Sequence, residues 1–248
     1  MNPSERIAFS VVIPAHNEEN YIGKCLKAAW AAAEAALPCR TEIIVVTNRC
    51  TDRTAEIAGE YGARVVPSEA DCISGVRNAG VRAARGSIIV TVDADSCMSE
   101  CALTEIRQML RSGKYIGGGA TPVFDRMSPG ILCSVLYVAW NLLPVMRKEG
   151  AYLSGAMFWF RRRDFEAVGG FDETLVSLED LDFARRMLRL GRTQQKSWGT
   201  LRKTKLITSS RKFDQFGDWY LIKNRDLTKR IFTGRDREAA DSFYYHTR

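Results

Sequence analysis

The stretch Gly86–Ser96, GSIIVTVDADS, decides the fold class of this chain. Its β-branched run Ile88–Val92 predicts a strand that is buried on both faces, as in parallel sheets. Asp93 and Asp95 follow at once, and two carboxylates at the end of a buried strand are costly to desolvate unless a cation lies beside them. A divalent ion, Mg²⁺ or Mn²⁺, that also binds phosphate oxygens is one candidate cation; the other interpretation is that both residues only cap the next helix.

The chain before this stretch alternates between strands and helices. Short apolar runs predict strands, and the polar loop after each run leads into a helical pattern. The predicted strands are Phe9–Ile13, which Pro14 ends, Thr41–Val46 and Ala63–Val66, and the predicted helices run from about Glu19 to Ala36, from about Asp52 to Tyr61 and over Ser74–Arg85. This order predicts an α/β fold with a doubly wound, mostly parallel sheet and helices on both faces.

Polar side chains follow three of these strands. Because the carboxyl ends of parallel strands meet at one edge of a sheet, we expect Glu18, Asn48 and the pair Asp93 and Asp95 to converge there. Asn17 is expected to cap the first helix. No Gly-x-Gly-x-x-Gly follows the first strand, so a dinucleotide or S-adenosylmethionine site has no support.

Composition and charge limit the kinds of partner that we expect the protein to bind. The net charge of +7 favours phosphorylated substrates or acidic membrane surfaces. No strongly basic helix or RNA-binding aromatic motif is present, so nucleic acid is not an expected partner. The seven cysteines are scattered without a Cys-x-x-Cys pair, which argues against a thiolate zinc site and favours a reduced cytoplasm. The first residues lack the apolar region of a signal peptide.

The second half of the chain is less regular. It predicts a helix over Glu100–Arg111, a glycine-rich strand over Tyr115–Thr121, a strand over Leu153–Phe160 and a helix that opens with Glu179 and Asp180. Acidic side chains in a first turn are favoured by the helix dipole, so we expect a low pKa for Asp180. The basic and aromatic segment Ser209–Arg248 either covers the site and meets phosphate or only packs against the domain.

The run Met127–Met146 carries no charged residue. It is long enough to be a membrane-span candidate, but Pro129, Asn141 and Pro144 interrupt it. Tyr137 and Trp140, with basic residues directly after the run, suit a peripheral membrane contact, at the inner face, or a homodimer contact. A buried helix is the equally favoured alternative.

Five motifs in order give the chain a family resemblance. They are Pro14–Glu18 (PAHNE), the loop Thr47–Thr54, Gly75–Gly80 (GVRNAG), Asp93–Asp95 (DAD), and Gly169–Asp172 (GGFD) followed by Glu179 and Asp180. Together they resemble the family-2 glycosyltransferases of GT-A fold, over roughly Ser10–Gly191. Each motif alone would be weak evidence.

The resemblance implies an inverting, metal-dependent transferase that moves a sugar from a nucleotide-diphosphate donor to an acceptor hydroxyl on a glycan, a lipid-linked molecule or a small molecule. It implies one GT-A domain over residues 1–248, with a nucleotide-binding half (1–98), an acceptor half (99–208) and the C-terminal segment (209–248). Carried over by position, Pro14, Ala15, His16 and Glu18 line the nucleoside pocket, Asn48 faces the base, Arg77 contacts base or phosphate, Asp93 binds the ribose, Asp95 with Asp93 holds Mg²⁺ or Mn²⁺, and Asp180 or, as second choice, Glu179 is the general base.

The chain departs from the family pattern at the second strand. The family usually has an aspartate where Thr47 or Asn48 stands, and an amide can donate as well as accept hydrogen bonds. Uracil is therefore favoured as the nucleobase, with guanine open. Gln195–Trp198 lacks the arginine of the Gln-x-x-Arg-Trp motif of processive members, which favours a single addition over polymerisation.

Two other function classes stay open. A sugar nucleotidyltransferase would share the sheet and the metal, but it usually has a glycine-rich, arginine-containing loop where Pro14–Glu19 stands. A non-catalytic binder of nucleotide sugars would not need Asp93, Asp95 and Asp180 together.

Overall fold

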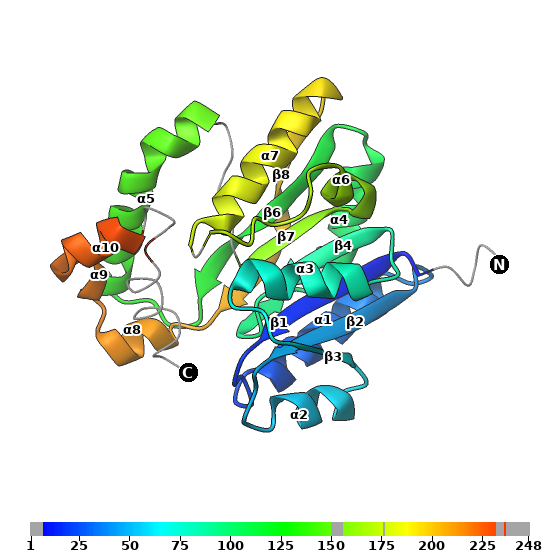
Figure 1. Cartoon of the computed structure of the whole chain (residues 1–248), viewed down its shortest axis with the longest axis horizontal. Coiled ribbons are helices and arrows are strands. Elements are labelled where there is room, and N and C mark those ends of the chain that lie inside the picture. The colour runs from blue at the N-terminus through cyan, green and yellow to red at the C-terminus, as the bar shows by residue number, and fades with distance from the viewer. Residues whose placement is uncertain (1–6, 150–155, 176, 232–235, 237–248) are drawn as a thin grey trace.

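The computed structural model describes residues 7–149, 156–175, 177–231 and 236, and its centre is one eight-stranded sheet (Figure 1). The strand order is β3-β2-β1-β4-β7-β6-β8-β5. The strands are β1 (Phe9–Ala15), β2 (Thr41–Asn48), β3 (Arg64–Ser68), β4 (Ile88–Val92), β5 (Ser96–Met98), β6 (Tyr115–Phe124), β7 (Met157–Arg161) and β8 (Ser197–Thr208).

The first four strands of that order are parallel, as the alternation of strands and helices predicts. Val11 in β1 lies between Ile43 of β2 and Val90 of β4, so these β-branched side chains form the middle of the sheet. Beyond β4 the sheet is mixed, because β7 is antiparallel to both β4 and β6. The parallel half positions the loops at one edge, and the mixed half extends the same sheet through the second half of the chain.

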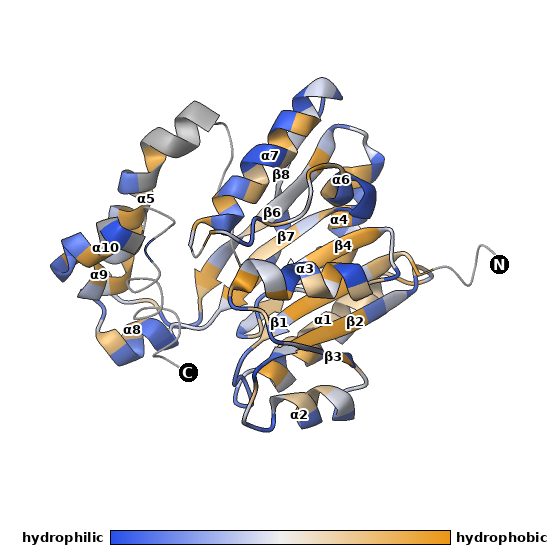
Figure 2. Ribbon diagram, in the orientation of Figure 1, coloured by the Kyte–Doolittle hydropathy of each residue, from blue (hydrophilic) through white to orange (hydrophobic). Residues whose placement is uncertain are grey.

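Helices cover both faces of the sheet, and each face has its own core (Figures 1 and 2). On one face lie α1 (Ile22–Ala35), α2 (Thr54–Glu60) and α4 (Ala102–Arg111), and on the other lie α3 (Ile73–Ala83), α6 (Arg162–Ala167) and α7 (Glu179–Thr193). Leu26 and Ile106 serve the first core, and Phe183 and Met187 the second. The helical spacing of these apolar residues explains why each helix buries a single stripe.

Four further helices form a group beside the sheet, which we call the side lobe (Figure 1). They are α5 (Pro129–Glu149), α8 (Arg211–Phe216), α9 (Tyr220–Lys223) and α10 (Arg225–Ile231). The Ser134 hydroxyl of α5 donates to the carbonyl oxygen of Asp218 at 2.6 Å, and Arg126 pairs with Asp214 and Asp218. These contacts hold α5 against the segment that follows β8.

Two local predictions at the first loop were wrong. Strand β1 continues through Pro14 to Ala15, because its pairing with β4 ends at Val12 and the missing N–H of Pro14 breaks no bond on that side. The first helix begins only at Ile22, and Asn17 does not cap it. The Asn17 Oδ1 instead accepts the backbone N–H of Thr51 at 2.8 Å, which ties the loop after β1 to the loop after β2.

Strands β5 and β8 were not predicted. Strand β8 carries three basic residues with exposed side chains, Arg202, Lys203 and Lys205. Because of these residues, the sequence does not show that the strand is partly buried. The predicted strand Leu153–Phe160 lies partly outside the described residues and is observed from Met157. Helix α5 runs through Asn141 and Pro144, and no helix within the described part of the chain has the length and apolar character needed to cross a membrane.

The glycine-rich strand β6 is held by close contacts. A Cβ on Gly118 would overlap the carbonyl oxygen of Gly199 in β8 and the ring of Trp159 in β7. Trp159 is fully buried and donates its indole N–H to the carbonyl oxygen of Gly119. Only glycine lets β6 lie between these two neighbours.

We predict that Gly118→Ala lowers the free energy of unfolding by about 3 kcal/mol, the upper part of the range for overpacking, because neither Gly199 nor Trp159 has room to move. Gly59→Ala is the matched control, since nothing lies within 4 Å of its added methyl group. In α2 that change should raise stability by up to about 1 kcal/mol. Urea unfolding of both variants measures the difference, and equal stabilities would contradict the packing argument.

Candidate active site

The loops after β1, β2 and β4 meet at the carboxyl edge of the parallel strands. Ala15 and Thr47 lie in register, which brings the next residues of the two strands together. His16 Nδ1 donates to the backbone oxygen of Asn48 at 2.6 Å, so the imidazole is fixed against the end of β2. Pro14 and Ala15 are buried at the end of β1 beside it.

The Asn48 side chain is buried, and its Oδ1 accepts no hydrogen bond from any residue that the structure describes. A buried acceptor without a partner costs about 1–3 kcal/mol. An N–H group of a ligand would remove that cost. Asn48 is therefore suited to recognising a ligand group that donates a hydrogen bond.

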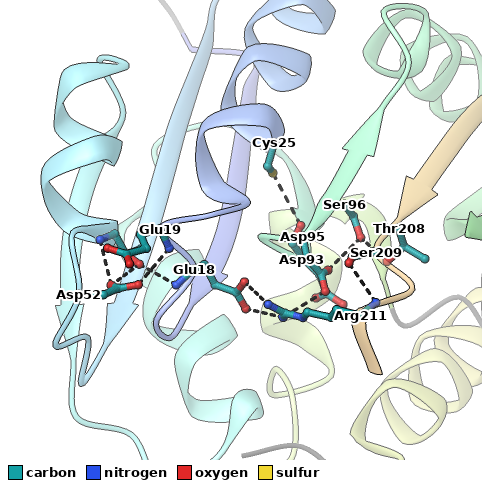
Figure 3. Close-up of polar contacts among 11 residues, drawn as sticks. Glu18, Glu19, Cys25, Asp52, Asp93, Asp95, Ser96, Thr208, Ser209 and Arg211 are labelled. Carbon is teal, nitrogen blue, oxygen red and sulfur yellow. Dashed lines mark hydrogen bonds and ion pairs between the residues drawn. The ribbon is translucent and has the colours of Figure 1, made fainter. Parts of the chain in front are cut away.

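Arg211 connects the carboxylate of Glu18, in the loop after β1, with that of Asp95, in the loop after β4 (Figure 3). Its guanidinium donates to both carboxylate oxygens of Glu18 at 2.6 and 2.7 Å, and its Nη2 lies 3.1 Å from Asp95 Oδ2. The same group stacks over the ring of Tyr21, with 4.7 Å from Cζ to the ring centroid. The backbone N–H of Ser209 also donates to the carbonyl oxygen of Asp95. The segment that leads into α8 thus closes over the Asp-x-Asp loop.

Sequence reasoning missed this role of Arg211. The tail was expected either to cover the site or only to pack, and no single residue of it was singled out. The available signal was Glu18, a carboxylate next to a buried strand end, since such a group requires a cation. Nothing in the sequence says which of the many basic residues supplies it.

Arg77 makes the second connection. Its side chain is 4% exposed, and it lies 3.1 Å from Asp93 through Nη2 and 2.7 Å from Glu179 through Nη1. Asp93 follows β4 directly and Glu179 begins α7, so one guanidinium joins the two halves of the chain. With two carboxylates beside it, Arg77 remains charged despite its burial.

Asn78 fixes the loop that leads into α7. It exchanges two hydrogen bonds of 2.9 Å with the backbone of Phe171, and it donates to Glu173 at 2.8 Å. Gly170 has φ of 76°, and a Cβ there would meet the Asn78 side chain. The Gly-Gly-Phe motif therefore serves to position the start of α7.

Helix α7 begins at Glu179, but the expected low pKa of Asp180 was wrong. Burial, followed by the nearby Glu179 carboxylate, raises the pKa of Asp180 to about 7. A helix dipole is worth about 0.3–1 kcal/mol and one pKa unit about 1.4 kcal/mol, so the dipole is too weak to offset burial. Glu179, the residue before Asp180, is paired with Arg77.

Asp95 is the carboxylate best suited to a metal. Burial and the neighbouring Asp93 raise its pKa, and Arg211 opposes that rise. In the part of the chain that the structure describes, no three His, Cys, Asp or Glu side chains form a complete metal site. Mg²⁺ and Mn²⁺ commonly take one or two carboxylates and complete their shells with phosphate oxygens and water. The oxygen donors of Asp95 and Asp93 fit such a shared site.

Sequence comparison assigns most of this region to one family. The family model described as "Glycosyl transferase family 2" matches residues 10–169. Among the relatives, "Probable glycosyltransferase YdaM" of Bacillus subtilis is 28% identical over 209 residues, which cover 77% of this chain and 49% of that protein. The chain therefore spans about half the length of YdaM.

Solved structures share the fold. TarS of S. aureus, residues 1–349 in complex with UDP-GlcNAc, superposes with a TM-score of 0.61 at 18% identity, covering 97% of this chain and 71% of that one. The mannosyltransferase PcManGT of Pyrobaculum calidifontis, in complex with GDP-Man and Mn²⁺, also gives 0.61, at 17% identity, covering 99% of this chain and 72% of that one. These likenesses confirm the expected GT-A fold class.

Proposed function

The chain belongs to glycosyl transferase family 2, and from this we propose that it is an inverting, divalent-metal-dependent transferase of one sugar from a nucleotide-diphosphate donor to an acceptor hydroxyl. One observation carries the proposal: two arginines and two aspartates meet at the carboxyl edge of the sheet. Arg77 and Arg211 suit a diphosphate, and Asp93 and Asp95 suit the ion that accompanies it.

For the nucleoside, we assign the base to Asn48 and the ribose to Asp93. The unpartnered Oδ1 of Asn48 can accept the N3–H of uracil or the N1–H of guanine. We assign the rest of the nucleoside pocket to His16, Pro14, Ala15 and Glu18. UDP-GlcNAc and GDP-Man each occupy a structure of this fold. We favour uracil and retain guanine as the alternative.

The diphosphate is the leaving group, and its charge must be neutralised as the glycosidic bond to it breaks. A divalent ion held by Asp95, with Asp93 beside it, supplies part of that neutralisation when bound. Arg211 shares its guanidinium between Glu18 and Asp95, so donor binding can move its outer N–H groups from the Asp95 carboxylate to a phosphate oxygen. Glu18 keeps the guanidinium in place during that exchange.

The acceptor hydroxyl loses its proton as it attacks the anomeric carbon from the face opposite the diphosphate. We assign that proton to the Asp180 carboxylate. A base with a pKa of about 7 is well matched to a reaction near neutral pH. One displacement of this kind inverts the anomeric centre and releases the nucleoside diphosphate.

The exposed face of α5 suggests where the acceptor is met. Leu132, Leu136 and Trp140 follow one another at helical spacing and are 49, 59 and 75% exposed. Lys223 and Arg225, at the end of α9 and the start of α10, are exposed in the same side lobe. An apolar stripe ending in tryptophan, in a lobe that also exposes cations, suits the surface of an anionic membrane, so we propose peripheral contact there.

Metal dependence is tested at Asp95. We predict that Asp95→Asn removes the gain in UDP affinity that Mn²⁺ gives the parent, because an amide is a poor ligand for a hard cation. Asp214→Asn, which removes a carboxylate of the side lobe, is the matched control. Titration calorimetry with and without Mn²⁺ measures the gain, and an unchanged gain in Asp95→Asn would take Asp95 out of the site.

The general base is tested at Asp180. Product analysis first identifies the donor and acceptor: release of nucleoside diphosphate supports transfer, whereas pyrophosphate would indicate a nucleotidyltransferase. We then predict that Asp180→Asn lowers turnover by ~10²–10⁴-fold without changing UDP affinity. Parent turnover should rise with pH through about 7 as Asp180 ionises, and the variant should lose that rise.

Asp182→Asn provides the control for that experiment. Asp182 lies in the same first turn and pairs with Arg186 at 2.7 Å, so it shares the helix position but not the proposed role. A turnover of Asp180→Asn within a few-fold of the parent would rule out Asp180 as the base, and Glu179 would be tested next.

Membrane contact is tested by flotation with vesicles that contain anionic lipid. We predict that the parent floats, that a high-salt or carbonate wash releases it, and that a Leu136→Ser, Trp140→Ser double variant no longer floats. Leu37→Ser is the control, because Leu37 is 64% exposed away from α5. A parent that stays in solution but dimerises through α5 would assign the stripe to a second copy instead.

A further inference from the structure

A half-open hollow lies at the opposite edge of the sheet, where β1 and β4 begin. Its volume is about 630 Å³. Six arginines line it together with a single acidic residue, Glu166: Arg85, Arg107, Arg111, Arg161, Arg162 and Arg163.

The strand register separates this hollow from the candidate active site. Phe9, the first residue of β1, pairs with Ile88 of β4, and Ile88 pairs with Arg161 at the end of the antiparallel strand β7. The loops after β1 and β4, which build the candidate active site, lie at the other ends of these two strands. The six steps between the seven residues of β1, at about 3.3 Å each, place the two sites about 20 Å apart. The proposed transfer reaction uses none of these arginines.

Neutral groups orient three of the guanidinium groups. Arg161 Nη2 donates to the carbonyl oxygen of Leu110 at 2.6 Å, and Arg162 Nε donates to that of Gly86 at 3.1 Å. Arg107 Nη1 donates to the Cys39 sulfur at 2.9 Å. Such contacts fix direction, but they leave the positive charge uncompensated.

Carboxylates compensate only part of that charge. Across the described ranges, the guanidinium groups of Arg85, Arg107, Arg111, Arg161 and Arg162 form no ion pair, and Arg163 reaches Asp164 only at 3.6 Å. Glu42 accepts the backbone N–H of Arg85 and not its side chain. The end of α4 contributes about half a negative charge, which is small against six cations.

Arg161 shows most directly that these guanidinium groups still lack hydrogen-bond acceptors within the described part of the chain. Its Nη1 is buried and has no hydrogen-bond partner among the residues that the structure describes. Burial, opposed by Asp164 but reinforced by the nearby Arg163, lowers the pKa of Arg161. An anion in the hollow would relieve the repulsion among these guanidinium groups.

We propose that the arginine-lined hollow binds an anion with one or more phosphate groups. The planar guanidinium fork matches phosphate oxygens in pairs, which favours arginine over lysine for this task. A volume of about 630 Å³ lies within the range of small-molecule sites. The phosphate belongs either to a free phosphorylated compound or to a lipid headgroup, and the proposal is independent of the function assigned above.

The test uses tripolyphosphate as the soluble probe and phosphatidic acid vesicles as the lipid probe. The variant is Arg85→Gln with Arg111→Gln, because both side chains are exposed and make no described side-chain contact. The matched control is Arg202→Gln with Lys203→Gln, which removes the same charge from exposed positions of β8. The candidate active site is identical in the parent, the variant and the control. A difference in affinity between the variant and the control is therefore due to the hollow.

We expect Arg85→Gln/Arg111→Gln to bind tripolyphosphate, the vesicles, or both at least tenfold more weakly than the parent, with the control within twofold. Loss for tripolyphosphate indicates a free anion, and loss for vesicles alone indicates a headgroup. Without phosphate at low salt, the variant should be at least as stable as the parent, since repulsion is reduced. Affinities within twofold of the parent for both probes would overturn the proposal, as would a parent that binds neither.

Discussion

Two guanidinium groups, those of the buried Arg77 and the half-buried Arg211, hold together parts of the chain that are remote in sequence. Glu18 is 2% exposed and Arg77 is 4% exposed, and a charge at such depth destabilises the fold by several kcal/mol unless it is paired. Arg211 lies 193 residues from Glu18, and Arg77 lies 102 residues from Glu179. The pairing therefore brings the segment after β8 onto the first loop and α7 onto α3. The residues that build the candidate site are the same residues that set the arrangement of the elements around it.

The parallel half of the fold could be predicted because its signals are local. Runs such as Ile88–Val92 fit a strand buried on both faces, and the helices between them repeat their apolar residues at helical spacing. The site loops follow from topology alone, since parallel strands end at one edge. The order of the short motifs added the family, whose model covers residues 10–169.

What the sequence could not supply depends on distant contacts. Asn17 fits a helix cap by residue type, yet its side chain bonds to Thr51 on the next loop. Strand β8 alternates too irregularly to be predicted, because its partners on the two sides are in different registers and directions. The pKa of Asp180 depends on burial, which no first-turn rule contains. The cation that pairs with Glu18 could not be predicted for the same reason, since the sequence does not say which carboxylate a basic residue of the tail will contact.

The separation between Glu18 and Arg211 has a consequence for synthesis. A ribosome adds about 5–20 residues per second, so the 193 residues between the two take roughly 10–40 s to make. During that interval β1, β2 and β4 can pair, but the guanidinium that binds the Glu18 carboxylate has not yet been synthesised. The loop edge of the parallel strands is thus made long before the cation that closes over it. That edge is completed only when the segment after β8 emerges.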